Sequence, residues 1–314
     1  MILDRRNFLK TTAAAGAAAV LGGTGTLNLA AEASAPGSFD FVFFTDTHIE
    51  PELDAPHGCE MCFEKVAGLR PEFAIMGGDH VYDANKVDEK RAGLVFDLYK
   101  KTESRLKMPL HHVIGNHDTF GTAEKGGIAM DDPRFGKKMF GERFGPTHYS
   151  FDHKGYHFVV LDSIQLTTDH MWEARIDAVQ LKWLEEDLKK AGPSVPIVAA
   201  THAPLVTAFP AYAGERYNPA ERYSTLSVAN ATEVLGAFEG HNLIAVLQGH
   251  LHVNENTTYK RTQFITGAAV CGNWWHGPRM GFLEGFTVVS LREGKISTRY
   301  ETYGFKSLDP REKF

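Results

Sequence analysis

The chain has 314 residues, of which 43% are hydrophobic and 23% are charged, as is ordinary for a folded globular protein with its own core. A formal net charge of −6 argues against a general nucleic-acid-polymer binder, which normally carries a basic face. The three cysteines, Cys59, Cys62 and Cys271, are too few for a disulfide framework.

The N-terminal residues 4–10, which include Arg5 and Arg6, resemble the twin-arginine export signal. A mildly apolar stretch rich in Ala, Gly and Leu follows, and small residues after it offer a cleavage site, so residues 1–35 are interpreted as a signal peptide. An uncleaved anchor is the alternative, but the Gly and Ala content makes a poor membrane span. We therefore expect the twin-arginine machinery to export the folded protein to the periplasm or medium, with no stable membrane anchor.

Residues 36–314 are predicted to form one domain, because the sequence shows no repeat and no convincing linker. Buried strands and amphipathic helices alternate along it, and Gly and Pro punctuate them. Strands are predicted at residues 39–45, 73–76, 110–114, 149–151, 156–161, 196–200, 243–247 and 285–291. Helices are predicted at residues 59–69, 86–106, 179–190 and 225–238, the last capped by Ser224 or Thr225. Lys154 and Gly155 are expected to turn a hairpin between the fourth and fifth strands.

Two long segments, residues 119–145 and 203–223, lack a periodic pattern and are predicted to be walls of a substrate pocket. Cys59 and Cys62 form a C-x-x-C at a predicted helix start. No redox context and no further thiolates accompany them, so a buried pair or an incidental disulfide is favoured over a catalytic or metal role.

Five short polar motifs each follow an apolar run. They are Asp46-Thr47-His48, Gly78-Asp79, Gly115-Asn116-His117-Asp118, Thr201-His202 and Gly249-His250-Leu251-His252. Because open α/β sheets place ligands at the carboxyl ends of their strands, we expect these motifs to meet at one edge. Their order along the chain makes them far more informative together than singly.

The side chains of these motifs are metal ligands by type. Asp46 and His48 are two residues apart, as are His250 and His252, and in an extended segment such pairs point the same way. The two carboxylate oxygens of Asp79 suit it to bridge two cations. Two carboxylates, one amide and four imidazoles favour iron, manganese, zinc or cobalt over calcium or magnesium.

The ordered set from Asp46 to His252 resembles the calcineurin-like metallophosphoesterase family. That resemblance implies an α/β fold, a four-layer sandwich of two mixed β-sheets flanked by helices. It implies a first metal held by Asp46, His48 and His252, a second held by Asn116, His202 and His250, and Asp79 as the bridge. It also implies that His117 faces the substrate, and we expect Asp118 to fix the orientation of that imidazole.

The implied activity is hydrolysis of a small phosphoester by water that two metal ions activate. His117 would protonate the departing alkoxide or bind a phosphate oxygen, with Asn116 also at the substrate. Without a recognisable cap domain the site is expected to be open, which favours phosphodiesters of the cyclic-nucleotide or glycerophosphodiester type. The alternatives are a phosphomonoesterase of the acid phosphatase or nucleotidase type, and a non-catalytic relative that binds phosphate ligands.

Several further residues are assigned from position alone. Tyr82 is interpreted as a packing residue, because His48 already serves the metal that a tyrosine binds in purple acid phosphatases. His80 is a candidate for contact with the site, and Trp274 and Trp275 are interpreted either as core or as a wall that binds substrate. Stacking with a flat group is suggested for these tryptophans and for Phe209, Tyr212 and Tyr217, and phosphate pairing or simple solvation for Arg216 and Arg222.

Overall fold

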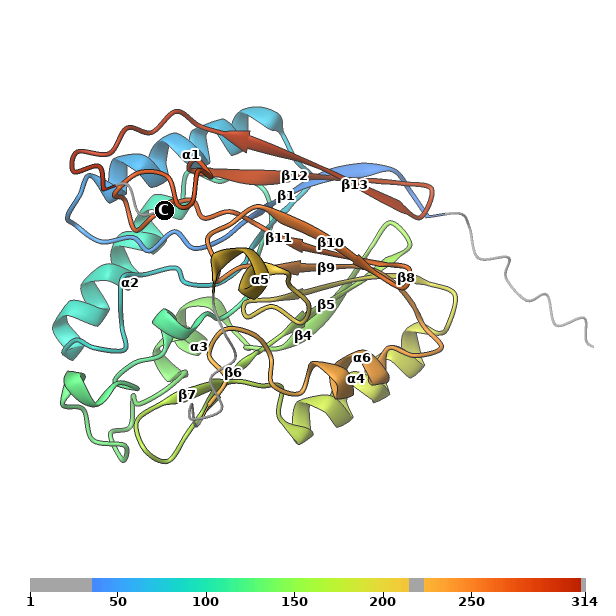
Figure 1. Cartoon of the computed structure of the whole chain (residues 1–314), viewed down its shortest axis with the longest axis horizontal. Coiled ribbons are helices and arrows are strands. Elements are labelled where there is room, and N and C mark those ends of the chain that lie inside the picture. The colour runs from blue at the N-terminus through green and yellow to red at the C-terminus, as the bar shows by residue number, and fades with distance from the viewer. Residues whose placement is uncertain (1–35, 215–222, 312–314) are drawn as a thin grey trace, which may run out of the picture. The chain divides into compact units, whose positions relative to one another are not determined.

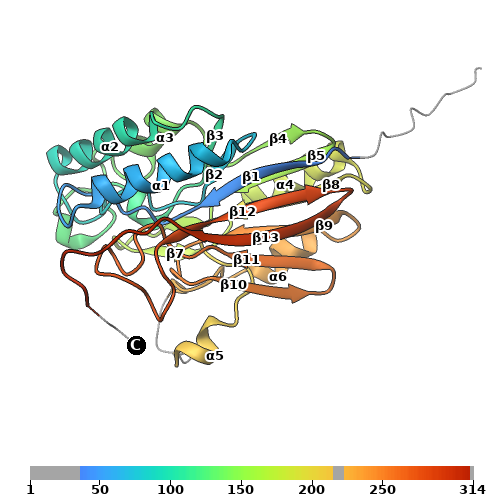
Figure 2. The same ribbon diagram turned by 90° about the horizontal axis from the view of Figure 1, so that it is seen from above.

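The computed structural model describes residues 36–214 and 223–311 (Figure 1). The predicted signal peptide and the residues Arg216, Tyr217 and Arg222 lie outside this part of the chain. Within it, two β-sheets pack face to face and helices cover their outer faces (Figures 1 and 2). This arrangement confirms the predicted α/β fold.

The first sheet has the strand order β13-β12-β1-β2-β3. Its strands are β1 (Phe39–Phe44), β2 (Ala74–Met76), β3 (Leu110–His112), β12 (Gly285–Arg292) and β13 (Lys295–Thr302). Strands β1, β2 and β3 are parallel, whereas β12 runs antiparallel to both β1 and β13. The sheet is therefore mixed, and its parallel strands end at one edge.

The second sheet has the order β10-β11-β9-β8-β5-β4. Its strands are β4 (Tyr149–His153), β5 (Tyr156–Leu161), β8 (Pro196–Thr201), β9 (Asn242–Gln248), β10 (Glu255–Tyr259) and β11 (Thr262–Thr266), and β6 (Ile164–Leu166) pairs separately with β7 (Trp172–Ala174). Strands β5, β8, β9 and β11 are parallel, with antiparallel β4 and β10 at the edges. The β4–β5 hairpin turns at Lys154 and Gly155, as predicted, and both have positive φ.

The helices are α1 (Ala55–Leu69), α2 (Glu89–Glu103), α3 (Lys138–Phe144), α4 (Ala178–Ala191), α5 (Phe209–Ala213) and α6 (Ala231–Ala237), with short 3₁₀ turns at η1 (Asn116–Asp118) and η2 (Glu124–Gly126). Asp88 caps α2 and Asp177 caps α4 through hydrogen bonds to backbone amides. Among the described residues, no helix has both the length and the apolar content needed to cross a membrane.

Alternation along β1 explains the four layers. Phe41 and Phe43 pack between the two sheets, while Val42 and Phe44 point outward to the helical layer of α1 and α2. Strand β5 does the same, with Val159 on its outer face against α4 and α6. Full burial of one such side chain contributes about 1.5–3 kcal/mol, so both faces of each central strand hold the fold together.

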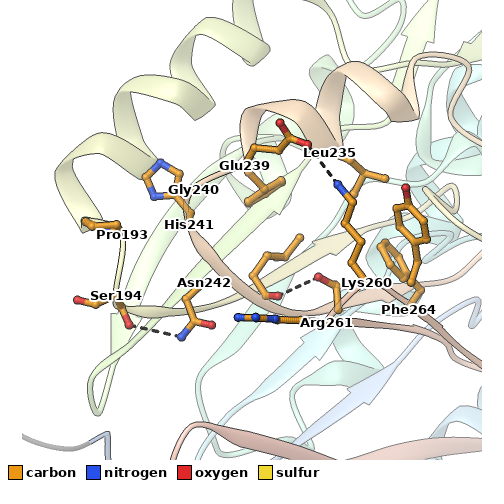
Figure 3. Close-up of a pocket in the computed structure, with 14 residues that line it drawn as sticks. Pro193, Ser194, Leu235, Glu239, Gly240, His241, Asn242, Lys260, Arg261 and Phe264 are labelled. Carbon is orange, nitrogen blue, oxygen red and sulfur yellow. Dashed lines mark hydrogen bonds and ion pairs between the residues drawn. The ribbon is translucent and has the colours of Figure 1, made fainter.

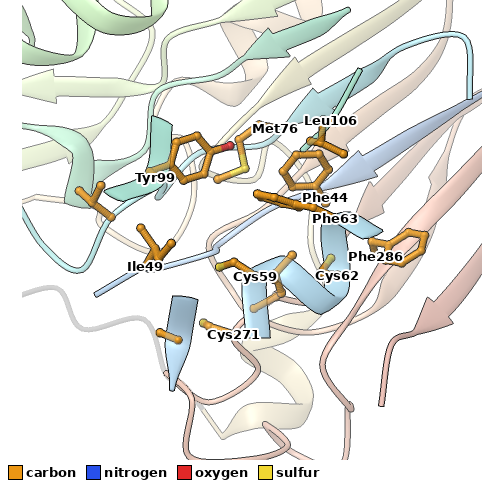
Figure 4. Close-up of a cluster of buried hydrophobic side chains, with 14 of the residues drawn as sticks. Phe44, Ile49, Cys59, Cys62, Phe63, Met76, Tyr99, Leu106, Cys271 and Phe286 are labelled. Carbon is orange, nitrogen blue, oxygen red and sulfur yellow. The ribbon is translucent and has the colours of Figure 1, made fainter. Parts of the chain in front are cut away.

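The cysteines belong to the outer cluster that covers the first sheet (Figure 4). Cys59, Cys62 and Cys271 are buried free thiols, and burial raises the pKa of each above its usual value. The interpretation as a buried pair is therefore confirmed, and the incidental disulfide is wrong. The predicted helix start at Cys59 is also wrong, because α1 begins at Ala55, with Pro56 in its first turn.

The helix predicted over residues 225–238 is shorter than expected. α6 begins at Ala231, and neither Ser224 nor Thr225 caps it. The Ser224 hydroxyl donates to the carbonyl of Ser227 instead, and Asn230 bonds the backbone of Ile176. Local side-chain to backbone bonds thus replace the first predicted turns of the helix.

Candidate metal centre

The five polar motifs converge where the parallel strands end. Asp46 and His48 follow β1, Asp79 follows β2, and Asn116 follows β3 in the first sheet. His202 follows β8, and His250 follows β9 in the second sheet. Because the two sheets pack against each other, their ends bring residues from five distant segments into one buried group.

One part of this group joins Asp46, His48 and His252. Nε2 of His252 lies 3.2 Å from Oδ1 of Asp46 and 3.1 Å from Nε2 of His48. Nε2 of His48 lies 3.8 Å from the same Asp46 oxygen. Three ligand atoms therefore face one another at the spacing of a metal site.

A second part joins Asp79, Asn116, His202 and His250. Nε2 of His202 lies 3.1 Å from Oδ2 of Asp79 and 3.2 Å from the amide oxygen of Asn116. Ligand atoms of Asp79, His202 and His250 all lie within 4.8 Å of one another. Oδ2 of Asp79 is also 3.5 Å from Nε2 of His48, so this one carboxylate reaches both parts.

Backbone carbonyls orient three of the imidazoles. Nδ1 of His202 donates to Gly77 at 2.9 Å, and Nδ1 of His252 donates to Gly272 at 2.6 Å. His250 uses its other nitrogen, because Nε2 donates to the carbonyl of Thr225 at 2.8 Å. Each bond selects the tautomer whose free lone pair is on the opposite ring nitrogen, available to a metal ion.

The donor set fits a cation. Burial lowers the pKa of His48 to about 4, so this imidazole is neutral at pH 7. Burial by itself would raise the pKa of Asp46, but His252 and His48 together hold it well below its usual value. Within the described chain, Oδ1 of Asp46 is buried and accepts no hydrogen bond. A buried anionic oxygen that accepts no hydrogen bond is costly, and a bound cation removes that cost.

Burial and a neighbouring carboxylate also have opposite effects on the pKa of His202. Burial would lower the pKa of His202, but the carboxylate of Asp79 raises it to about 9. Burial would likewise raise the pKa of Asp79, and the neighbouring His202 and His117 lower it. A metal ion would compete with the proton on Nε2 of His202.

The backbone of the ligands is not extended. Asp46, His48, Asp79, His250 and His252 all have φ between 38° and 73°. The expected extended backbone is therefore wrong, because these residues adopt left-handed conformations, although the side chains of Asp46 and His48 still lie 3.8 Å apart. Such conformations are uncommon for residues other than glycine and cost free energy, so the surrounding contacts must impose them.

Two glycines are needed for the backbone to approach the ligands. Gly78 has φ 103°, and a Cβ there would lie 2.5 Å from Nδ1 of His202. A Cβ on Gly115 would lie 2.2 Å from the amide nitrogen of Asp79. Both distances are shorter than contact allows, so larger residues would displace the loops that carry Asp79 and Asn116.

The expected role of Asp118 is wrong. Its carboxylate accepts hydrogen bonds from the amides of Asp79, His80 and Gly115 at 2.8–3.0 Å, and from Nδ1 of His80. It therefore joins two loops instead of orienting His117. The carboxylate nearest to the imidazole of His117 is Asp83, whose Oδ2 lies 3.7 Å from Nδ1.

His80 packs beneath the metal-ligand group and contacts it indirectly. Its Nε2 lies 3.0 Å from Nδ1 of His112, and its ring stacks on Phe144 of α3 at 4.5 Å. His80 contacts Asp118 as well, so it reaches the site through that carboxylate. Residues 119–145, predicted to be a pocket wall, thus contribute through α3 to the packing beneath the ligands.

The aromatic residues that were predicted to lie in the core or at the substrate site have different environments in the structure. Trp275 is fully buried and its indole donates to the carbonyl of His48 at 3.1 Å, whereas Trp274 is half-buried against the ring of His252. Tyr82 is not a core packing residue, because it is 37% exposed beside His48 and His117. Phe209 is buried, so it cannot stack with a substrate.

Two residues beside the ligands were not predicted from the sequence. Asp83 follows Asp79 by four residues, and only this spacing could have indicated it. Cys271 places its sulfur 3.8 Å from Nδ1 of His252, and it shares a ligand-capable group with His48. Burial raises the pKa of this thiol well above its usual value, so it is a neutral neighbour of the site.

An open groove of about 780 Å³ lies elsewhere (Figure 3). Residues at the amino ends of β8 and β9, such as Ser194 and Asn242, line it together with Lys260 and Arg261. His202 and His250 follow the opposite ends of the same strands. The groove is therefore separate from the metal-ligand group and cannot deliver a substrate to it.

Known proteins resemble this chain in both sequence and fold. A family model described as calcineurin-like phosphoesterase matches residues 39–254, more than half of the chain. A signal sequence of the twin-arginine translocation pathway matches residues 3–22, which indicates export of the folded protein to the periplasm or medium. A dimetal phosphatase from Danio rerio shares the fold, with a TM-score of 0.61 and 14% identity over 86% of this chain and 98% of that one.

Two curated relatives share a part of their sequence with this chain. A cAMP/cGMP dual specificity phosphodiesterase of Mycobacterium tuberculosis is 25% identical over 209 residues, which are 65% of this chain but only 56% of the relative. The serine/threonine-protein phosphatase CPPED1 of Bos taurus is 24% identical over 234 residues, 74% of this chain and 67% of the relative. On the family match, the chain belongs to the calcineurin-like phosphoesterase family.

Proposed function

We propose that residues 36–314 form one exported phosphodiesterase domain that uses two metal ions. Asp46, His48 and His252 would hold the first ion, and Asn116, His202 and His250 the second. The supporting observation is Asp79, whose Oδ2 lies 3.5 Å from His48 and 3.1 Å from His202. A carboxylate within reach of both groups is the bridge that a two-metal centre needs. The imidazole-rich set favours iron, manganese or zinc.

When bound, the metal ions supply Lewis-acid stabilisation of the phosphoryl oxygens and an activated water near neutral pH. The chain contributes the proton for the leaving group. Burial would lower the pKa of His117, but Asp79 and Asp83 raise it, so these carboxylates favour the protonated imidazole. Its Nδ1 lies toward Asp83, which keeps the ring in place for transfer to a departing alkoxide. The side-chain amide of Asn116 would hold a phosphate oxygen beside His117.

A small phosphodiester is the substrate we favour, with a cyclic nucleotide or a glycerophosphodiester as the type. The name of the mycobacterial relative supports this choice, and the bovine relative supports the alternative of a phosphomonoesterase. A non-catalytic phosphate-binding relative is the third reading. The acidic chain favours small substrates over nucleic-acid polymers.

The test uses the mature protein purified without chelator. Metal content by mass spectrometry is combined with turnover of p-nitrophenyl phosphate and bis(p-nitrophenyl) phosphate. We expect close to two metal ions per chain and higher kcat/KM for the diester. Preference for the monoester would replace the phosphodiesterase proposal by the phosphatase one. Bound metal with no turnover of either would contradict both.

A further inference from the structure

Two aromatic residues come from backbone segments on opposite sides of the His48 segment. In the first sheet β1 lies between β2 and β12, and the segments around the metal-ligand group keep that order. The amide of His48 donates to Asp79, and the amide of Tyr82 donates to Ile49 on the β2 side. On the β12 side, the amide of Cys271 donates to Asp46. Tyr82 and Trp274 therefore come from segments that flank His48.

The rings of both residues lie close to the imidazole of His48. The ring centroid of Tyr82 lies 5.9 Å from that of His48, and the centroid of Trp274 lies 6.1 Å from it. Tyr82 also lies nearly parallel to His117, at 24° and 5.9 Å. Trp274 instead contacts His252 at 4.7 Å. One aromatic ring thus borders the imidazole that would donate the proton, and the other borders the far side of the first metal group.

Trp274 is held in this place by its neighbour. Trp275 is fully buried, its indole bonds the carbonyl of His48, and it packs on Gly58 of α1, where a Cβ would lie 2.2 Å from the ring. Both tryptophans have positive φ, at 46° and 66°. Two bulky residues in this conformation are strained, and the anchoring of Trp275 imposes it.

The indole nitrogen of Trp274 adds a second observation. It is shielded from solvent and has no acceptor within the described ranges. A buried N–H without a partner is costly, and the ring as a whole remains half-exposed. A bound substrate can cover the exposed part of the ring.

We propose that Tyr82 and Trp274 form two separate subsites for planar groups, one for the leaving group and one for the second ester substituent of a phosphodiester. This assignment rests on the proposed function, because it takes His117 as the proton donor. The proton donor must lie beside the leaving oxygen, and Tyr82 is the aromatic ring next to His117. Trp274, on the other side of His48, then meets the group that stays on phosphorus. A monoester has no such group.

The charges near the two rings differ. Tyr82 lies near the carboxylates of Asp83 and Glu50, which raise the pKa of its phenol together with burial, so the ring stays neutral. The guanidinium of Arg279 lies 5.3 Å from the Trp274 ring centroid, within the range of a cation–π contact. The two subsites therefore select a diester with a separate planar group on each ester oxygen. Neither a cyclic nucleotide nor a glycerophosphodiester carries two such groups, so this inference narrows the proposed phosphodiesters to other members of the class.

The kinetic test compares three substrates with the same leaving group: p-nitrophenyl phosphate, methyl p-nitrophenyl phosphate and bis(p-nitrophenyl) phosphate. W274A should lower kcat/KM for the bis-aryl diester by roughly threefold to tenfold, and leave the methyl diester and the monoester within twofold. Y82A should lower kcat/KM for all three alike. W274F and Y82F, which keep a ring, should restore most of each loss. Y259A, which removes an exposed tyrosine of β10, is the matched control.

Binding supplies a readout that needs no turnover. The holoenzyme is titrated with diphenylphosphinate and dimethylphosphinate, which contain no ester bond, while metal content is measured in every variant. Both alanine variants should weaken diphenylphosphinate by roughly threefold to tenfold and leave dimethylphosphinate unchanged. Equal affinity of the wild type for the two anions, or equal losses for all three substrates in W274A, would overturn the subsites while leaving the hydrolase intact. Tighter binding of diphenylphosphinate without any turnover would retain the subsites and reject the proposed function.

Discussion

The carboxylate of Asp83 lies 3.7 Å from Nδ1 of His117, inside ion-pair range but longer than a hydrogen bond. Asp83 is buried and follows Asp79 in the loop after β2, whereas His117 follows β3. The loop that carries the proposed bridging ligand therefore also carries the partner of the proposed proton donor. Any change that moves this loop affects both functions.

Replacing Asp83 by Asn tests that partnership. The variant keeps the size of the side chain but removes the charge that stabilises protonated His117. We expect kcat to fall by about tenfold for phenyl esters, which have poor leaving groups, and less for p-nitrophenyl esters. The slope of log kcat against leaving-group pKa measures this. Equal losses for both leaving groups would show that Asp83 does not act through proton donation.

Replacing Asp118 by Ala should have a different effect. The buried carboxylate accepts four hydrogen bonds that join the loops of Asp79 and Gly115. Leaving those donors unpaired should lower the free energy of unfolding by about 2–4 kcal/mol and reduce metal content. Urea unfolding and mass spectrometry measure both, with D83N as the variant expected to keep its metal. Unchanged stability in D118A would contradict the structural role.

Replacing Asp79 by Ala should remove both metal ions. Without the bridging carboxylate, two cations a few ångströms apart repel each other with no anion between them. The matched variant is H117A, which should keep near-normal metal content while turnover falls. Retention of both ions in D79A would refute the bridge, and loss of metal in H117A would make His117 a ligand.

Gly58→Ala tests the anchor of Trp275. The added Cβ would lie 2.2 Å from the indole ring, so we expect a loss of about 1–3 kcal/mol in the free energy of unfolding. Gly68→Ala in the same helix is the control, because its Cβ meets nothing within 4 Å and the helix should gain up to about 1 kcal/mol. Thermal denaturation measures both variants. A loss of stability in Gly58→Ala alone would confirm the packing of Trp275 on Gly58, and equal stability of the two variants would contradict it.

The stability of the fold should depend on pH through His111. This imidazole is stacked on Phe151 at 3.6 Å, and burial lowers its pKa from 6.5 to about 4. The unfolded chain binds this proton first, so stability is complete above pH 6.5 and falls as pH drops from about 6.5 to 4. H111Q should reduce that fall by about 1–3 kcal/mol in total, as measured by urea unfolding at several pH values. An unchanged pH dependence would show that His111 is readily protonated in the fold.

The amino-acid sequence by itself determined the family-level features of this protein. The continuous apolar run of residues 41–44 in β1 predicts a strand buried on both faces, because successive side chains of a strand point to opposite faces. The type and order of Asp46, Asp79, His202 and His250 indicate a metal centre, because ligand chemistry belongs to the residue itself. Neither inference depends on contacts between distant segments.

The tertiary structure alone decided which groups act together. Asp118 is adjacent to His117 in sequence, but η1 directs its carboxylate to the Asp79 loop, so Asp83 takes the place beside the imidazole. Trp274 and Trp275 are equivalent in the sequence, and only the space above Gly58 sends one into the core and the other to the metal-ligand group. Left-handed backbone angles and packing between distant segments set these directions, and no local pattern encodes them.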